Sequence, residues 1–229
     1  MKILFKELIL NIFKPPALTS FDVIRAVRKE GAIKKAGHAG SLDPFATGVL
    51  LVCLGDSTKK ISELMELKKE YEGVMEFGTI TDTYDAYGKI KEIKPVKRYS
   101  PDLLERLFSK FIGKIMQIPP MYSAVKYSGV PLYKIARAGR EVERKPKEVK
   151  IYSLKILKYE SPFLTFKITC SKGTYIRTLA YDIGQRLGCG SYLKSLTRTK
   201  VGKYSIRDSL FLGDLGSYFN SQKFYGSCK

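Results

Sequence analysis

The chain has 229 residues, 44% of them hydrophobic and 12% aromatic, so it is predicted to fold around a real core and not to be intrinsically disordered. Its 41 Lys and Arg against 22 Asp and Glu give a formal charge of +19, an excess that repels itself in a compact state unless a polyanion binds. Nucleic acid is the expected polyanion. An anionic membrane surface is the competing interpretation, but no segment reaches the roughly 18 uncharged apolar residues of a spanning helix.

The N-terminus and the cysteines indicate the compartment. The apolar stretch from Met1 to Phe13 is interrupted by Lys6 and Glu7 and has no small-residue cleavage site, so no signal peptide is predicted. The cysteines are scattered without paired spacing, which favours reduced thiols over disulfides or a zinc site. They are Cys53, Cys170, Cys189 and Cys228. The sequence therefore predicts a cytoplasmic protein without a metal.

The first predicted elements are a strand and a capped helix. The strand is expected at about 8–13. Residues 19–22, Thr-Ser-Phe-Asp, resemble a capping box that opens a helix, and Gly31 is expected to end it. The apolar face of this helix is predicted to hold Phe21, Ile24 and Val27.

The middle of the chain alternates strands and helices. The six apolar residues of 49–54 show no polar alternation, which indicates a strand buried on both faces. A helix is predicted at about 57–68. Apolar and charged residues alternate over 71–77, which is typical of a half-exposed strand. A further helix is predicted to begin at Ser100-Pro101 and to stop at Gly113.

The last predicted elements are a hairpin and a helix. Two strands over 149–159 and 163–171 are joined by a turn, and a helix runs from about Thr174 to the residue before Gly188. Strands and helices are mixed, without regular strand-helix-strand alternation or internal repeats. The predicted fold class is α+β with a substantially antiparallel sheet.

One segment differs from the rest in charge. Residues 126–150 hold eight Lys or Arg against three Glu, show weak apolar periodicity, and follow Pro119-Pro120. We interpret this segment as a mobile basic excursion that contacts RNA, because phosphate contacts supply most of the non-specific affinity for nucleic acid. The tyrosines among its cations would suit such contact; they are Tyr122, Tyr127 and Tyr133. The alternative is a solvated surface loop.

The most informative segment is a glycine-punctuated loop ahead of the buried strand. It contains His38, the only histidine of the chain, and Asp43. Gly37 and Gly40 permit backbone angles closed to other residues, and Pro44 holds the preceding residue extended. The backbone therefore fixes Asp43, and a rigid strand beneath a polar loop suits catalysis. The alternative is an ordinary turn-forming aspartate and a loop histidine.

Residues 37–44, Gly-His-Ala-Gly-Ser-Leu-Asp-Pro, with 46–50, Ala-Thr-Gly-Val-Leu, resemble the signature of the TruB family of tRNA pseudouridine synthases. The similarity runs from about residue 8 to 205. Further segments match in the same order: Lys14-Pro15 with Thr19-Ser20, Lys69-Glu70-Tyr71, Thr81-Asp82-Thr83 ahead of Asp85, Pro119 to Lys126, and Gly173 to Arg177. The resemblance implies a pseudouridine synthase fold, with a mixed, mostly antiparallel bent central sheet flanked by helices and a basic thumb-like insertion at about 117–150.

The resemblance also implies the reaction. A uridine of the tRNA T loop, conventionally numbered 55, would be isomerised to pseudouridine without a cofactor, nucleotide or metal. Asp43 would be the nucleophile that attacks C1′ or the pyrimidine ring, or it would remove a sugar proton. Arg177 would pair with Asp43 and keep it ionised, although a purely structural salt bridge is the alternative for this arginine.

Other matched residues would handle the base. The uridine must flip out of the T loop, and His38 is similar to the family residue that enters the vacated space, where a neutral imidazole can stack. Tyr71 resembles the family tyrosine that stacks on the base and suits proton removal from C5. Without the family, Tyr71 would be interpreted as core.

Four more residues are predicted substrate contacts by the same resemblance. Tyr175 and Leu196 would line the base pocket, although both could equally be core. Arg198 ends the matched Leu-x-x-Leu-x-Arg run. Lys14 would either support the loop or touch phosphate.

The chain departs from the family in three places. Ala17 stands where a glycine is usual, and Tyr84 and Tyr87 crowd the Thr-Asp-Thr loop. The sequence stops about 25 residues after Tyr204, which leaves no room for the small PUA-type RNA-binding domain of family members. The prediction is therefore a single catalytic domain over 1–229, a monomer that binds the T arm of tRNA.

Three alternatives compete with this interpretation. The first is a non-catalytic RNA-binding or RNA-folding protein of the same fold. The second is a related synthase acting on a different RNA, including the guide-RNA-dependent branch. The third is a glycosidase-like enzyme, which would need a second catalytic carboxylate near Asp43; neither Asp82 nor Asp85 is a compelling candidate from sequence.

Overall fold

The computed structural model describes residues 7–225. Cys228 and residues 1–6, the first part of the apolar N-terminal stretch, lie outside the described residues. The chain forms two compact units, which we call unit 1, residues 1–70 with 197–229, and unit 2, residues 71–196. Each is described by itself, and the expectation of a single catalytic domain stays a prediction.

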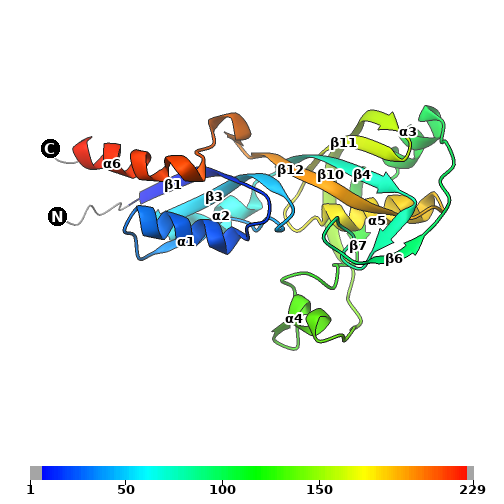
Figure 1. Cartoon of the computed structure of the whole chain (residues 1–229), viewed down its shortest axis with the longest axis horizontal. Coiled ribbons are helices and arrows are strands. Elements are labelled where there is room, and N and C mark those ends of the chain that lie inside the picture. Colours follow the sequence, from blue (N-terminus) through cyan, green and yellow to red (C-terminus); the bar gives the residue numbers. More distant parts are fainter. Residues whose placement is uncertain (1–6, 226–229) are drawn as a thin grey trace. The chain divides into compact units, whose positions relative to one another are not determined.

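Unit 1 is a sheet with helices on both faces (Figure 1). Its elements are β1 (Glu7–Lys14), α1 (Ser20–Glu30), β2 (Ala36–His38), β3 (Thr47–Gly55), η1 (Asp56–Lys60), α2 (Ile61–Glu66), the end of β12 (Ser191–Val201), β13 (Tyr204–Ser205), η2 (Ile206–Asp208), η3 (Leu212–Asp214) and α6 (Leu215–Tyr225). β1 and β2 run antiparallel to β3, whereas β12 joins β3 in parallel.

Strand β3 is the centre of unit 1, and its seven interior residues are all buried. Leu50, Val52 and Leu54 point to the face covered by α1 and α6. The residues between them, Val49, Leu51 and Cys53, point to the opposite face, where Leu64 of α2 packs. Both faces are covered, so an apolar residue is needed at every position. The predicted strand buried on both faces is confirmed.

Helix α1 begins at the predicted capping box. Thr19 Oγ1 accepts from the backbone N–H of Asp22 at 3.1 Å, and Asp22 Oδ2 accepts from the backbone N–H of Thr19 at 2.7 Å. Gly31 ends the helix as expected. The prediction for Phe21 was wrong, because this side chain is 55% exposed. It lies about 100° from the buried stripe, one residue step around the helix; the buried residues are Ser20, Val23, Ile24 and Val27.

The helix predicted at 57–68 is shorter and divided. Asp56–Lys60 is a 3₁₀ turn and only Ile61–Glu66 is α-helical. The hydroxyl of Thr58 donates to the carbonyl of Gly55 at 2.7 Å, which holds the first turn in its tighter form. Leu67 then turns to extended backbone ahead of the next strand.

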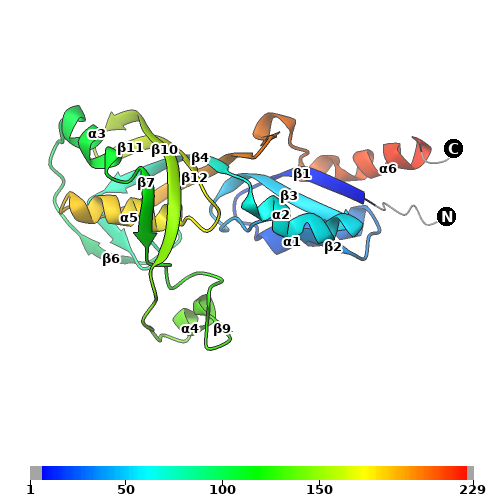
Figure 2. The same ribbon diagram turned by 180° about the vertical axis from the view of Figure 1, so that it is seen from behind.

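Unit 2 is built on a mostly antiparallel set of strands with α5 along one face (Figures 1 and 2). Its elements are β4 (Lys69–Phe77), β5 (Thr79–Thr81), β6 (Ile90–Ile93), α3 (Pro101–Ser109), β7 (Gly113–Gln117), β8 (Lys126–Tyr127), β9 (Val130–Pro131), α4 (Leu132–Arg137), β10 (Lys147–Glu160), β11 (Phe163–Cys170), α5 (Ile176–Arg186) and the start of β12. β10 pairs antiparallel with both β11 and β7. The predicted α+β class with a mostly antiparallel mixed sheet is confirmed.

Local patterns in unit 2 gave mostly correct predictions. Burial alternates along all nine residues of β4, as predicted for a half-exposed strand. Ser100 caps α3 by accepting from the N–H of Leu103 at 3.4 Å. The predicted stop at Gly113 was wrong, because α3 ends at Ser109. Gly113 instead has a φ of 102° and opens β7, a backbone angle that favours glycine.

The insertion, residues 117–150, is folded and not an extended loop. It contains the β8–β9 hairpin and α4, which stand apart from the sheet of unit 2 beyond the ends of β7 and β10 (Figures 1 and 2). Met121, Leu132 and Ile135 form a small buried core of its own. The apolar periodicity of this segment is weak because these residues come from a turn and a single short helix, too short to show a period.

Candidate active site

The Asp43 loop of unit 1 is held by its backbone. The N–H of Leu42 donates to Ser20 Oγ at 2.9 Å, and the same hydroxyl donates to the Leu42 carbonyl at 3.2 Å. The N–H of Ala46 donates to the Asp43 carbonyl at 3.1 Å and closes the turn. Asp43 itself is half-buried. The loop therefore presents a carboxylate from a fixed backbone, as predicted from the glycines and the proline.

Arg198 joins this loop to β3 through hydrogen bonds to backbone carbonyls of both. Its side chain is only 1% exposed. Nε donates to the Val49 carbonyl at 2.7 Å, Nη1 to Ser41 at 3.3 Å and Nη2 to Gly40 at 3.1 Å. A Cβ on Gly48 would lie 2.2 Å from the Arg198 carbonyl oxygen, so this approach of β3 and β12 requires glycine. These contacts give Arg198 a positioning role, and direct substrate contact stays a prediction.

Lys14 is the second buried cation beneath the loop. Its side chain is fully buried, and Nζ donates to the carbonyls of Pro15 and Leu18 at 2.8 Å each and of Pro44 at 3.3 Å. Burial lowers the pKa of Lys14 to about 8, while the carboxylate of Asp43 acts in the opposite direction. Of the two predicted roles, these contacts favour support of the loop.

Ala17, which stands where the family usually has glycine, adopts a backbone conformation that favours glycine. Its φ of 63° lies in the left-handed region, where a side chain costs about 1 kcal/mol or more and glycine is at ease. The backbone N–H of Ala17 donates to the Pro44 carbonyl at 2.9 Å. The chain therefore keeps the loop conformation without the usual glycine.

His38 lies in β2, paired with Val52 of β3. Within residues 7–225 its buried Nδ1 has no hydrogen-bond partner. Burial lowers the pKa of His38 below 6.5, and the positive charge of Arg198 lowers it further. The imidazole is therefore neutral at pH 7, the form that the predicted stacking role needs.

Arg177 is a buried arginine of unit 2 that contacts two loops. It lies in the first turn of α5 and is 3% exposed. Nη1 donates to the Thr83 carbonyl at 2.9 Å, and Nη2 donates to the Tyr122 carbonyl at 3.0 Å. Nη1 also lies 3.4 Å from Asp85 Oδ2. Arg177 thus joins α5 to the Thr-Asp-Thr loop and to the insertion, while its pairing with Asp43 stays a prediction.

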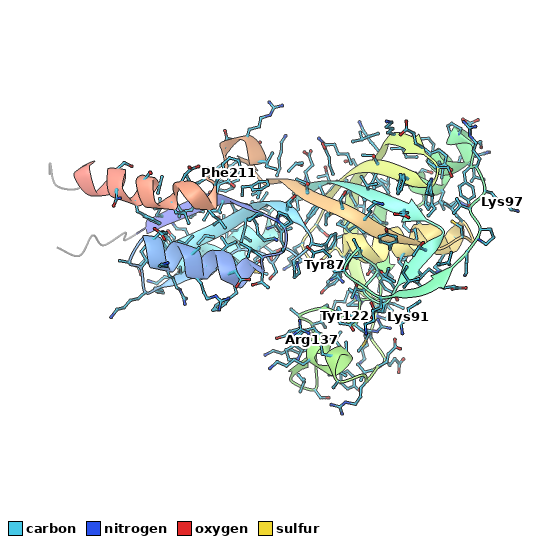
Figure 3. All side chains as sticks on the ribbon, in the orientation of Figure 1. Tyr87, Lys91, Lys97, Tyr122, Arg137 and Phe211 are labelled. Atoms are coloured by element: carbon cyan, nitrogen blue, oxygen red, sulfur yellow. The ribbon has the colours of Figure 1, made fainter. Side chains whose placement is uncertain are left out.

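Asp85 is the buried carboxylate next to Arg177, and from sequence it was not a compelling catalytic candidate. It is 5% exposed, and Oδ1 accepts from Thr83 Oγ1 at 2.7 Å and from the N–H of Tyr87 at 2.9 Å. Its other oxygen faces Arg177. Tyr87, labelled in Figure 3, is 59% exposed. In sequence, an aspartate in a polar loop has the pattern of a turn, and nothing indicated its burial.

Tyr84, the second departure from the family pattern, packs against α5. Tyr84 has a φ of 61° and stacks on the ring of Tyr181 in α5, with centroids 4.0 Å apart. Burial raises the pKa of Tyr84. This stack attaches the Thr-Asp-Thr loop to the same helix that carries Arg177.

The predicted base-pocket residues lie in ordered positions of unit 2. Tyr71 is 8% exposed on the buried face of β4, and Leu196 is 6% exposed on β12. Tyr175 precedes α5, where its N–H donates to Gln117 Oε1 at 3.0 Å and its carbonyl accepts from Gln117 Nε2 at 3.1 Å. No sequence pattern indicated Gln117, which is 1% exposed. The roles of these residues toward the base stay predictions.

Two general findings concern the described part of the chain. Across residues 7–225, no three His, Cys, Asp or Glu side chains gather in a way that could hold a metal ion. In the same range, every helix is too short or too polar to cross a membrane.

Two family domains and several relatives match this chain over most of its length. The N-terminal domain of the TruB family of pseudouridylate synthases matches residues 28–176, and the C-terminal domain of tRNA pseudouridylate synthase B matches residues 177–224. The tRNA pseudouridine synthase B of Clostridium acetobutylicum is 50% identical over 207 residues, which are 90% of this chain and 71% of that protein. That of Clostridium tetani is 47% identical over 216 residues, 94% of this chain and 74% of that protein.

Solved structures agree on the fold. A chain of a Cbf5-Nop10-Gar1 complex superposes with a TM-score of 0.75 at 29% identity, over 96% of this chain and 56% of the solved chain. A chain of an H/ACA RNP bound to a substrate RNA containing 2′-deoxyuridine gives 0.71 at 26% identity, over the same shares. The chain thus spans little more than half of these solved chains. These superpositions confirm the predicted fold. The matched family domains and the two relatives define the chain as a pseudouridine synthase, an isomerase.

The family follows from the motifs and the matched domains together. The chain belongs to the TruB family of tRNA pseudouridine synthases. The resemblance seen in the Asp43 loop is thereby confirmed.

Proposed function

We propose that the chain isomerises uridine 55 in the T loop of tRNA to pseudouridine, with Asp43 as the nucleophile. The N1–C1′ bond breaks, the base turns, and C5 bonds to C1′. The proton on C5 leaves, and N1 ends protonated, so the atoms are rearranged without gain or loss. No redox cofactor is needed for this balance. The enzyme acts on the T arm as a cytoplasmic monomer.

The observation that carries this proposal is the Asp43 loop itself. Two buried cations, Arg198 and Lys14, bind the carbonyls on either side of Asp43, and the turn closes through its own backbone. A carboxylate held beside fixed positive charge is pre-organised to act as an anion. Attack at C1′, attack on the ring and removal of a sugar proton remain three routes open to it.

Arg177 and Tyr71 complete the proposed machinery. Arg177 keeps the nucleophile ionised by pairing with it, and its guanidinium is itself held by Asp85 and by two backbone carbonyls. Tyr71 stacks on the base and takes the proton from C5 once the base has been reattached. Tyr175 and Leu196 line the base pocket.

Base flipping is the step that gives the substrate access. Extruding the uridine costs a few kcal/mol, which stacking and hydrogen bonds in the enzyme must offset. The neutral imidazole of His38 enters the vacated space, where its buried and unpaired Nδ1 gains a partner.

The relatives favour tRNA over a guided substrate. Proteins named tRNA pseudouridine synthase B are 47% and 50% identical to this chain, whereas the chains from H/ACA assemblies are 26% and 29% identical. A non-catalytic RNA-binding protein would have no need of Asp43, Tyr71 and Arg177 together.

Tritium release tests the proposal. The intact protein is expected to release tritium from tRNA labelled at uridine C5, and Asp43→Ala is expected to lower the rate by at least about four orders of magnitude. Asp56→Ala removes an exposed carboxylate of the same unit and is the matched control, expected to retain full activity. Binding of tRNA without release by the intact protein would contradict the proposal and support the non-catalytic alternative.

A further inference from the structure

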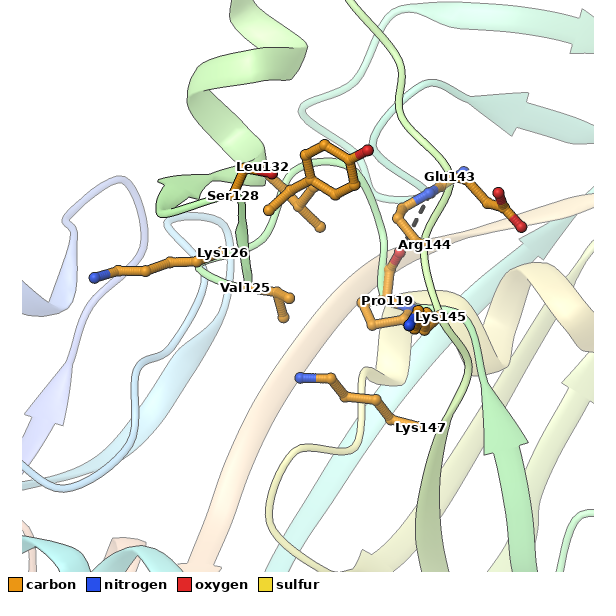
Figure 4. Close-up of a pocket in the computed structure, with 10 residues that line it drawn as sticks. Pro119, Val125, Lys126, Ser128, Leu132, Glu143, Arg144, Lys145 and Lys147 are labelled. Atoms are coloured by element: carbon orange, nitrogen blue, oxygen red, sulfur yellow. Dashed lines mark hydrogen bonds between the residues drawn. The ribbon is translucent and has the colours of Figure 1, made fainter.

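The insertion contains a pocket of about 500 Å³ between the β8–β9 hairpin and the segment that leads into β10 (Figure 4). This volume lies within the roughly 300–1,000 Å³ of sites that hold small ligands. The residues that line it are of two kinds, apolar and basic. The apolar ones include Pro119, Val125 and Leu132, and the basic ones include Lys126, Lys145 and Lys147.

The apolar side of the pocket belongs to the small core of the insertion. Leu132 is 2% exposed and belongs to the small core of the insertion. Val125 packs against the same core and is half-buried. Tyr127 also lines the pocket and is 47% exposed, which leaves its ring accessible. An apolar wall with an accessible aromatic ring suits the face of a nucleobase.

The basic side carries charge that the protein does not neutralise. Among residues 7–225, Lys126, Lys145 and Lys147 are exposed and form no ion pair. Figure 4 shows the Lys147 side chain reaching into the space below Val125. Glu143 is the one carboxylate in the lining, so positive charge predominates. The site therefore attracts an anion.

Arg144 differs from these lysines and shapes the pocket. Its guanidinium donates to Glu141 at 2.9 Å and to the Pro119 carbonyl at 3.2 Å, the dashed line in Figure 4. It thereby ties the returning segment to the start of the insertion. Because its hydrogen bonds are internal, the free cations for a ligand are the lysines.

We propose that this pocket binds one nucleotide of the RNA substrate other than the reacting uridine. The base packs on Val125, Leu132 and Tyr127, and its phosphate is held by Lys145 and Lys147. The inference rests on the proposed function, because it takes RNA as the substrate. Phosphate alone would need only the lysines, so the apolar wall selects a nucleotide.

The rest of the insertion favours a polynucleotide over a free nucleotide. Lys134, Arg137 and Arg140 are exposed on α4 and the turn after it, and Arg137 is labelled in Figure 3. A single nucleotide would leave these three cations without a partner. A chain with a phosphate at every step would bind them and the pocket together.

Single abasic nucleotides in a T-arm stem-loop RNA test the pocket. One position other than the reacting uridine is expected to weaken binding to the intact protein roughly tenfold when its base is removed. In Tyr127→Ala, the same abasic substitution is expected to cost less than twofold, because the ring that holds the base is gone. Lys147→Ala is expected to weaken binding of the intact RNA and to make the salt dependence shallower by about 0.7 in log–log slope.

Matched controls lie on β10, outside the insertion. Tyr152→Ala and Lys155→Ala remove an exposed aromatic ring and an exposed lysine of the same unit. Both are expected to leave the affinity and the abasic effects unchanged. A thermal melt of every variant shows that the fold is intact.

The outcomes separate this inference from the proposed function. Equal abasic costs in the intact protein and in Tyr127→Ala would overturn the pocket assignment, and tritium release would still establish the reaction. Binding of free uridine monophosphate to the pocket, with RNA affinity unchanged by the substitutions, would overturn the assignment to RNA. Absence of both RNA binding and tritium release would overturn the two proposals together.

Discussion

Basic residues do different work in the Asp43 loop and in the insertion. Beneath the loop, Arg198 and Lys14 are buried and direct their N–H groups at backbone carbonyls. In the insertion, Lys145 and Lys147 are exposed and no ion pair is found for them among the described residues. The buried cations fix a backbone, and the exposed ones are available to a ligand. A net charge of +19 therefore does not show by itself which cations bind RNA.

This comparison predicts opposite effects of substitution. Buried cations should matter first for stability and, through the loop, for the rate of reaction. Exposed cations should matter for RNA affinity and its salt dependence, with little effect on stability.

The largest expected effect is that of Arg198→Met. The substitution leaves three loop and strand carbonyls without their donor, and we expect the free energy of unfolding to fall by about 3 to 5 kcal/mol. Urea unfolding measures it. Arg198→Lys should lower the free energy of unfolding by less, because lysine keeps one charged donor group. Arg137→Met, an exposed arginine of the insertion, is the control and should change stability by less than about 0.5 kcal/mol.

Lys14 gives a test by pH. Its pKa in the folded protein is about 8 against the usual 10.5, so between these values the unfolded state binds more protons than the folded state. The stability of the wild type relative to Lys14→Met should therefore rise with pH, by up to about 3 kcal/mol between pH 8 and 10.5. Below about pH 7 the difference should be flat. A difference that falls with pH would contradict burial as the dominant influence on this lysine.

Asp85→Asn should have a smaller effect. It keeps the shape of the side chain but removes the charge opposite Arg177, and we expect a loss of about 2 kcal/mol in the free energy of unfolding. The rate of tritium release should also fall. Glu72→Gln breaks the half-exposed pair with Lys167 and should cost less than about 1 kcal/mol. Equal losses of unfolding free energy in Asp85→Asn and Glu72→Gln would show that burial does not strengthen the Asp85–Arg177 pair.

The smallest effect on stability is expected from neutralising the insertion. Replacing Lys134, Arg137 and Arg140 together by Gln should change the melting temperature little, because all three are exposed. Affinity for tRNA should fall, and the log–log salt slope should become shallower by up to about 2 if each contacts a phosphate. Affinity unchanged at every salt concentration would leave the insertion an ordinary surface element.

Local signals in the sequence predicted local structure well. The capping box before α1, the apolar run of β3 and the alternation of β4 each depend on neighbours in the chain. Errors arose where the outcome depends on distant contacts. Phe21 fits a helical period but misses the buried stripe, and Gly113 begins a strand where a helix stop was expected.

The site shows the same limit. Asp43 and its loop were predictable, because glycine, proline and the family motif all lie in one segment. The burial of Arg198 and Lys14 was not predictable, because the sequence does not show which cations lie next to backbone carbonyls in the folded chain. The burial of Asp85 and Gln117 was not predictable for the same reason, since their partners are Arg177 and Tyr175, far along the chain.

The most direct test of the central claim counts tritium released from tRNA labelled at C5 of every uridine. With uridine at position 55, the intact protein should release one tritium per tRNA, and with cytidine at that position it should release none. Release that persists from the cytidine-55 tRNA, or that survives in Asp43→Ala, would contradict the account.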